Sequence, residues 1–443
     1  MSEVRNIVRL ASRLRWILGG MASARVMAAI GCPVYALLRG SEQDGKFDLL
    51  KVKSILVVRL DEIGDVVMTT PFLRELRCNV PNAWITLVVK PSIYNLVEIC
   101  PYVNEVLTYD WSTPRLLRLF QRHWRAAKLS RRHLWHRRFD LAILPRWDTD
   151  YYHGTFLTYF SGAVWRVGYS ENVNASKKRL NQGLDRLFTH MLEDSALKHE
   201  VEHNLDVIRS LGGELHDDRL ELWLDEEDET FADEVLKNHG FKPGDLLIGL
   251  GPGAGAPKRQ WPLSCYKELG VWLQNQYAAR LVIIGGPGEE LLGSELQKQL
   301  GRSCIDLVGK TTLRQATAIL KRTSVFVGSD AGPMHMAAAV GVPVVELSCH
   351  PKSGFPYSAN SPRRFRPWCR NHKIVQPELP LPECTEECNA DRPHCILSIT
   401  VDQVKQVVSQ LLDGRGVIQG RHVGFGQDLG VEKVSNRTGE EKG

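Results

Sequence analysis

Segment 328–339 combines residue types that suit phosphate binding: Asp330, Gly332, Pro333 and His335 follow directly after a short apolar run. The run predicts a buried strand, and the Gly, Asp and Pro residues predict a tight loop before a helix. The first turn of such a helix offers unpaired N–H groups and the positive end of the helix dipole. In this interpretation Asp330 caps the helix and Gly332 lets the backbone approach a ligand. The alternative is an ordinary strand–helix turn in which His335 is only a packed histidine.

The elements that must position this segment follow an alternating pattern of apolar runs and helical stretches. The apolar runs form two series, at 54–58, 84–89, 106–107 and 141–144, and at 246–250, 280–286, 305–308, 325–327 and 342–347. Such alternation predicts an α/β fold with parallel sheets. Two series predict two Rossmann-like domains that face each other across a cleft, with ligands at the carboxyl ends of the strands. An acidic stretch at 225–244 is predicted to link them.

The composition is typical of a soluble globular protein, since 43% of the 443 residues are hydrophobic and 24% are charged. No apolar run reaches the roughly 20 residues of a membrane-spanning helix. Arginines interrupt the apolar pattern near the N-terminus, which argues against a signal peptide. The ten cysteines are mostly scattered and single, as in a reducing compartment. We therefore expect a cytoplasmic protein.

Basic charge is concentrated in two segments, although the net charge is only +5. Residues 1–40 contain six Arg and one Glu, and residues 115–138 contain eight Arg, one Lys and no acid. The first segment has the pattern of a helix lying in an anionic membrane interface, and a helix docked on its own protein would look the same. The second predicts a basic helix that attracts an anionic partner through Arg115, Arg118, Arg122 and Arg125. Nucleic acid is not expected, because no nucleic-acid module is recognisable around these charges.

Three motifs in a fixed order make the chain similar to glycosyltransferase family 9, the family of ADP-heptose–lipopolysaccharide heptosyltransferases. They lie at residues 57–65, at 257–262 with 283–290, and at 328–339. Each motif alone is weak, but together they span roughly residues 54–412 in the order and spacing of the family.

The resemblance implies a GT-B fold whose first domain binds the acceptor and whose second domain binds a nucleotide sugar. We expect domains at 53–240 and 241–412, between a basic extension at 1–52 and a disordered tail at 413–443. The implied reaction moves a heptose, with inversion, from an ADP-heptose-type donor to a lipopolysaccharide core or related anionic glycolipid. It implies no obligatory metal or other cofactor. Such an enzyme would act as a peripheral protein on the inner face of the cytoplasmic membrane.

Asp65 matches the catalytic aspartate proposed for the family, which would take the proton of the acceptor hydroxyl. It follows Gly64 in a strand-to-helix loop, from which its carboxylate could point into the cleft. The alternative is that Asp65 only caps a helix starting near Val66. Asp61 and Glu62 are close enough in sequence to be rival bases.

The resemblance places the cations for the donor diphosphate before Trp261. The family position two residues before this Trp is usually Lys, and here it is Arg259 with Lys258 adjacent. Either side chain could pair with diphosphate oxygens, and both could instead be solvated loop charges.

The nucleotide is expected beside a glycine pair after the next strand. Gly285 and Gly286 would leave room for it, and Glu289 or Glu290 would bind the ribose or base, as a family acidic residue near this position does. The alternative is that these two carboxylates only begin a surface helix. By resemblance the site is completed by Asp330, Gly332, Pro333 and His335.

Four late cysteines and two histidines could hold a metal or could be free thiols in a lid-like loop. They are Cys369, Cys384, Cys388 and Cys395, with His372 and His394. The spacing roughly suits a metal site but matches no standard zinc pattern. We therefore favour free thiols and expect no metal.

Two other function classes remain open from the sequence. A nicotinamide-dependent oxidoreductase would share the fold class, but the loop after the first strand lacks G-x-G-x-x-G. A non-catalytic protein that binds an anionic polymer would account for the basic segments.

Overall fold

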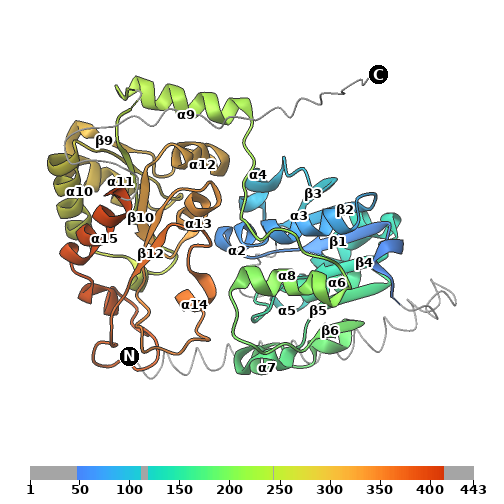
Figure 1. Cartoon of the computed structure of the whole chain (residues 1–443). Helices are drawn as coiled ribbons and strands as arrows, with labels where there is room; N and C mark the ends of the chain where they lie inside the picture. The colour runs from blue at the N-terminus through green and yellow to red at the C-terminus, as the bar shows by residue number, and fades with distance from the viewer. Residues whose placement is uncertain (1–46, 111–117, 243, 414–443) are drawn as a thin grey trace, which may run out of the picture.

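The computed structural model describes residues 47–110, 118–242 and 244–413 (Figure 1). The predictions of an interfacial helix near the N-terminus and of a disordered tail lie outside these residues. Within them, no helix is both long and apolar enough to cross a bilayer.

The first half of the chain forms a six-stranded parallel sheet in the order β3-β2-β1-β4-β5-β6. Its strands are β1 (Ser54–Val58), β2 (Trp84–Val89), β3 (Glu105–Thr108), β4 (Leu141–Leu144), β5 (Trp165–Tyr169) and β6 (His190–Leu192). After Ser54 the central strand β1 is apolar and buried, as expected for a parallel strand covered on both faces.

The second half forms another six-stranded parallel sheet, in the order β12-β11-β10-β7-β8-β9. Its strands are β7 (Leu247–Gly251), β8 (Arg280–Ile283), β9 (Cys304–Asp306), β10 (Val325–Ser329), β11 (Val344–Leu347) and β12 (His372–Val375). Strand β10 runs two residues beyond the predicted apolar run, because Gly328 keeps the ladder with Gly251 and Glu346 on either side.

Helices cover both faces of each sheet and separate successive strands (Figure 1). In the first half they are α2 (Ile63–Val67), α3 (Thr70–Asn79), α4 (Tyr94–Val97), α5 (Arg118–Leu129), α6 (Gly154–Phe160), α7 (Ala175–Leu180) and α8 (Glu200–Ser210). In the second half they are α9 (Glu226–Asn238), α10 (Leu263–Tyr277), α11 (Glu290–Leu300), α12 (Leu313–Lys321), α13 (Gly332–Ala339), α14 (Pro362–Phe365) and α15 (Val401–Asp413). The predicted fold of two Rossmann-like halves with parallel sheets is confirmed.

The two halves lie side by side as lobes, with α2 and α13 facing each other between them (Figure 1). Arg314 of α12 ties them together at one end of this junction. Its guanidinium lies 2.7 Å from Glu98 of the first half and pairs with Asp225 and Asp228 at the start of α9, at 2.9 and 2.7 Å. The domain limits of 53–240 and 241–412 stay a prediction.

Candidate active site

Two glycines allow the N-terminal ends of α2 and α13 to meet. A Cβ on Gly64 would lie 2.5 Å from Cδ2 of His335, and a Cβ on Gly332 would lie 3.0 Å from Cβ of Ile63. A contact of 2.5 Å is one that real Cβ atoms essentially never make, so the imidazole of His335 needs a glycine at position 64. The structure therefore brings His335 beside the residue that precedes Asp65.

A pocket of about 150 Å³ lies on the second-half side of this junction. It is lined by the loops after β7 and β10, by the first turn of α13 and by Ile63 of α2. Strands β7 and β10 are neighbours at which the strand order of the second sheet reverses. Such a switch point is where open α/β sheets bind their ligands, and the helix N-terminus favours an anion.

The first sheet has its own switch point between β1 and β4, and charged residues gather there. Asp61 is buried between two arginines: its carboxylate lies 3.0 Å from Nε of Arg59 and accepts from Arg146. Burial raises the pKa of the Asp61 carboxyl, although Arg146 and Arg59 act in the opposite direction. Asp61 is thus enclosed by the protein and cannot reach an acceptor hydroxyl.

Glu62 is also committed to other groups. Its Oε1 accepts from Nζ of Lys90 at 2.6 Å and from the hydroxyl of Tyr152 at 2.7 Å. Burial raises the pKa of Glu62, but the bonds from Lys90 and Tyr152 outweigh it, and the net shift is downward. A carboxylate held in this way is a poor proton acceptor.

Asp65 differs from both neighbours. Its side chain is 21% exposed, its Oδ1 lies 3.6 Å from Arg59, and its Oδ2 accepts from the backbone N–H of Glu62 at 3.3 Å. The residue is the third of α2, because this helix begins at Ile63 rather than near Val66 as predicted. Asp65 therefore contributes to the helix cap and still presents its carboxylate to solvent at the junction.

A buried arginine from the second half joins this charged group, and sequence reasoning missed it. Arg364 of α14 is fully buried; it donates to Asp148 at 2.8 Å, and its guanidinium lies 3.5 Å from Glu200. Burial raises the pKa of Asp148, but Arg364 and Arg146 reverse this and lower it to about 2. Glu200 also lies 3.3 Å from Arg59, so a continuous charge network runs from α14 to the base candidate.

On the second-half side of the junction, Glu289 turns into the pocket. Its Oε2 accepts from the backbone N–H of Gly286 at 2.9 Å, and a Cβ on Gly253 would lie 2.2 Å from its carboxylate. Glu290 instead accepts from the N–H of Gly288, at the start of α11. Of the two alternatives left open by the sequence, Glu289 is the one that lines the pocket.

Arg259, Asp330 and His335 form a charged group beside the first turn of α13. Asp330 Oδ2 lies 3.2 Å from Arg259, and Asp330 Oδ1 lies 3.8 Å from Nε2 of His335. Burial alone would raise the pKa of the Asp330 carboxyl. The opposite effect of Arg259 and His335 is larger, so the pKa lies below its usual value. The cap position of α13 is Ala331, so the expected capping role of Asp330 is wrong and its carboxylate pairs with Arg259 instead.

Lys258 points away from this group. Its Nζ donates to the backbone carbonyl of Cys388 at 2.5 Å. Gly286, Gly332 and Pro333 line the pocket as expected. Gly285 does not line it, but a Cβ on Gly285 would lie 2.8 Å from Oε2 of Glu289, which does. Of the two cations that the sequence could not separate, Arg259 is the one that lies beside Asp330 and the first turn of α13.

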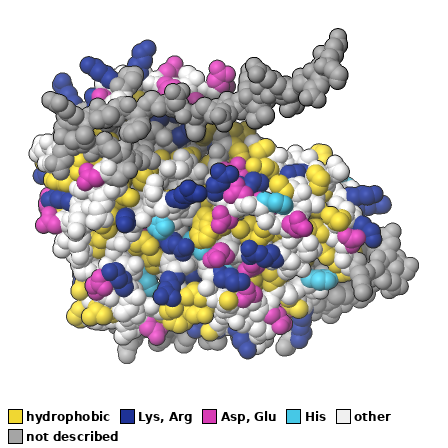
Figure 2. Space-filling view, viewed as in Figure 1, with side chains coloured by type: hydrophobic (Ala, Val, Ile, Leu, Met, Phe, Trp, Pro, Cys, Tyr) yellow, Lys and Arg dark blue, Asp and Glu magenta, His cyan; other side chains and the backbone are white. Residues whose placement is uncertain are grey.

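The arginines predicted to bind the acceptor are described only in part. Arg115 and the side chains of Arg118 and Arg122 lie outside the described residues, while Arg125 is half-buried on α5. On the face shown in Figure 2, basic and acidic side chains are interspersed rather than segregated. The basic helix as an acceptor site stays a prediction.

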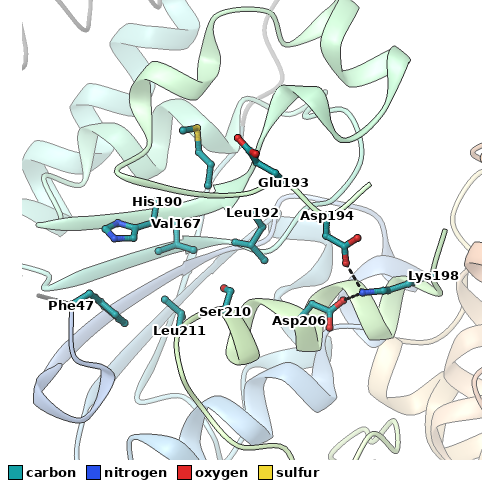
Figure 3. A pocket seen from close by; sticks show the side chains of 11 residues that line it. Phe47, Val167, His190, Leu192, Glu193, Asp194, Lys198, Asp206, Ser210 and Leu211 are labelled. Carbon is teal, nitrogen blue, oxygen red and sulfur yellow. Dashed lines mark hydrogen bonds and ion pairs between the residues drawn. The ribbon is translucent and has the colours of Figure 1, made fainter. Parts of the chain in front are cut away.

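Two larger cavities lie away from this junction. One of about 420 Å³, shown in Figure 3, is built from the outer edge of the first sheet and contains Lys198 between Asp194 and Asp206. The other, of about 850 Å³, lies at the opposite end of α13, beside Trp368 and Arg366. Neither is lined by the first turn of α13.

Two parallel-sheet lobes whose switch points face each other define the GT-B class of fold. The model of glycosyltransferase family 9 (heptosyltransferase) matches residues 128–394, more than half of the chain, and the chain belongs to this family.

Known relatives agree with this assignment. The chain is 22% identical to the lipopolysaccharide core heptosyltransferase OpsX of Haemophilus influenzae, over 73% of this chain and 84% of that protein. It resembles the family 9 glycosyltransferase of Veillonella parvula with a TM-score of 0.68 and 22% identity, covering 84% of this chain and 99% of that one. It also resembles the ADP-heptose lipopolysaccharide heptosyltransferase II of Escherichia coli, with a TM-score of 0.60 and 20% identity, over 82% and 99% of the two chains.

Proposed function

We propose that this protein is an inverting glycosyltransferase that moves a heptose from an ADP-heptose-type donor to a lipopolysaccharide core acceptor. One observation carries the proposal: the Asp65 end of α2 meets the phosphate-suited end of α13, with His335 packed on Gly64 between them. A proton acceptor on one lobe and an anion site on the other are what a single-displacement sugar transfer needs.

In the proposed reaction Asp65 accepts the proton of the acceptor hydroxyl as its oxygen attacks the anomeric carbon. The bond between that carbon and the diphosphate oxygen breaks, and the nucleoside diphosphate leaves. The N–H groups of the first turn of α13, together with Arg259, stabilise the charge that develops on the diphosphate. His335 lies between the two lobes, against Gly64 and 3.8 Å from Asp330, and in this proposal it would contact the sugar or the diphosphate.

The second lobe supplies the nucleotide contacts in this proposal. The loops at Gly253 and Gly286 line the pocket, and Glu289 would turn from the Gly286 N–H to the ribose hydroxyls when the nucleotide enters. Residues 241–412 would then act as the donor domain and 53–240 as the acceptor domain. No obligatory cofactor is used by these steps.

The acceptor and the location are proposed on two grounds. By their names, OpsX is a heptosyltransferase of the lipopolysaccharide core and the Escherichia coli protein is an ADP-heptose lipopolysaccharide heptosyltransferase. The basic segments 1–40 and 115–138 suit the phosphates of an anionic glycolipid and the surface of the membrane that carries it. We therefore propose peripheral action at the cytoplasmic face of the inner membrane.

A donor screen tests the function. The full chain is mixed with a deacylated or vesicle-borne core acceptor and, in turn, with ADP-heptose, ADP-glucose, UDP- and GDP-sugars, and free nucleotide is measured. We expect ADP release from ADP-heptose that depends on the acceptor. Release from none of the donors, with calorimetric binding of a polyanion in preference to ADP, would favour the non-catalytic polymer-binding alternative. Turnover of a nicotinamide cofactor would favour an oxidoreductase.

A further inference from the structure

Three cysteines and a histidine converge in the irregular loop that leads from β12 to the last helix. This cysteine–histidine cluster consists of Cys384, Cys388, His394 and Cys395. All four potential ligand atoms lie within 4.8 Å of one another, and the side chains of Cys388 and Cys395 are fully buried. Cys369 and His372, which the sequence also offered as ligands, are not part of this cluster. Nδ1 of His372 lies 2.7 Å from the carbonyl oxygen of Cys369.

Two nitrogen–sulfur separations within the cluster match those of a tetrahedral metal site. Nδ1 of His394 lies 3.5 Å from Sγ of Cys384 and 3.5 Å from Sγ of Cys395. A zinc ion with metal–sulfur bonds of about 2.3 Å and a metal–nitrogen bond of about 2.0 Å, at tetrahedral angles, places nitrogen and sulfur about 3.5 Å apart. Three thiols and one imidazole are also a complete ligand set for structural zinc, with no position left open.

The loop that carries the cluster has no regular secondary structure. Residues 376–394 form no helix or strand. Long segments without secondary structure are uncommon inside compact domains unless they are functional or held by a cross-link. A bound ion that joins Cys384 to Cys395 would close this loop and hold its backbone in one conformation.

The same loop contacts residues 257–261, the segment that carries Arg259, which is proposed to bind the diphosphate of the donor. The carbonyl of Cys388 accepts from Lys258, and the carbonyl of Ile399, just past Cys395, accepts from Nε1 of Trp261 at 3.0 Å. These two hydrogen bonds hold the residues before and after Arg259 in the chain.

A third link runs through side chains. The carboxylate of Glu387 accepts from the hydroxyl of Ser358, whose oxygen accepts from the N–H of Asn360 at 3.3 Å, and Asn360 accepts from the guanidinium of Arg259. Movement of the loop would therefore move Arg259.

We propose that the cysteine–histidine cluster binds one zinc ion, which fixes the loop at 376–394 against residues 257–261 and so holds Arg259 in place. This departs from the expectation, drawn from the sequence, that the chain binds no metal. The metal site itself does not rest on the proposed sugar transfer; only its effect on donor binding does.

Metal content tests the site directly. The full chain is purified without a metal-affinity tag from medium containing both zinc and iron, and its metals are measured by inductively coupled plasma mass spectrometry. We expect one zinc ion per chain. Protein that is folded by circular dichroism and holds no zinc, or holds stoichiometric iron instead, would overturn the assignment.

Cobalt substitution and variants identify the ligands. Cobalt-loaded protein should show the visible absorption of a tetrahedral thiolate site. Cys388→Ser should lose the metal, His394→Cys should keep it with stronger thiolate-to-cobalt absorption, and Cys369→Ser, which alters a thiol outside the cluster, should change neither. Loss of metal in Cys369→Ser, or full retention in both Cys388→Ser and His394→Ala, would contradict the proposed ligand set.

Removal of the ion tests the link to the donor segment. Zinc is released with a mercurial and a chelator, the thiols are restored with a reductant, and ADP affinity is measured by calorimetry before and after zinc is returned. We expect weaker ADP binding in the metal-free protein and recovery on reloading. Unchanged ADP affinity would leave the metal site standing but refute its role in placing Arg259, whereas no ADP binding in the zinc-loaded protein would count against the proposed function instead.

Discussion

Asp65→Asn is expected to lower kcat about 10²- to 10⁴-fold, the usual contribution of a positioned general base, and to leave ADP affinity unchanged. The amide keeps the size of the carboxylate and can still accept the Glu62 N–H that Asp65 Oδ2 accepts at 3.3 Å. It cannot take a proton from the acceptor. The fall should therefore appear in turnover, measured as ADP release at saturating donor and acceptor, and not in calorimetric binding of ADP.

Glu62→Gln is the matched control, because it removes a carboxylate three residues away that is already held by Lys90 and Tyr152. We expect it to retain most of the activity. If Asp65→Asn turned over normally, or if Glu62→Gln were equally damaged at unchanged thermal stability, Asp65 would not be the base.

Arg259→Met is expected to have the second largest effect. Loss of one charged hydrogen-bonding group to the diphosphate should weaken ADP binding about 10- to 100-fold, and loss of one donor to developing charge should lower kcat about 10²-fold or more. The arginine also pairs with Asp330 and Asn360, so thermal stability is measured in parallel. Arg259→Lys should keep part of the ADP affinity, because lysine retains the positive charge. It should not keep all of it, because an ammonium group cannot form the bidentate contact of a guanidinium.

Lys258→Met separates the two neighbouring cations. Lys258 donates to the Cys388 carbonyl rather than into the pocket, so its loss should leave direct diphosphate contacts intact. We expect a small change in ADP affinity and a lower unfolding temperature. A loss of ADP affinity in Lys258→Met that matched or exceeded the loss in Arg259→Met would reverse the roles assigned to them.

The sequence could predict the fold because its central strands are long apolar runs. β1, β2 and β4 occupy the predicted residues, since a parallel strand buried on both faces needs a continuous apolar segment. Three strands toward the sheet edges were missed: β5, β6 and β12. They contain Arg166, His190 and Lys373, and a short edge strand needs less apolar surface, so its sequence resembles a loop.

The candidate site was only partly predictable, for a different reason. Asp65, Glu289 and His335 lie at or just after strand-to-helix turns, which the residue types and their spacing in the sequence are enough to predict. The contacts that decide their roles come from distant positions: Arg364 reaches Glu200 and Asp148 across the junction. The convergence of His394 on Cys384 likewise depends on a loop path that no local pattern encodes.

The anomeric configuration of the product is the most direct test of a single base facing a diphosphate site. The wild-type protein is given ADP-heptose and a deacylated core acceptor, and the coupling at the new glycosidic bond is read by NMR. Direct attack by a hydroxyl deprotonated by Asp65 predicts that the configuration is opposite to that of the donor. A product with the donor's configuration would require a different mechanism and would contradict the central claim.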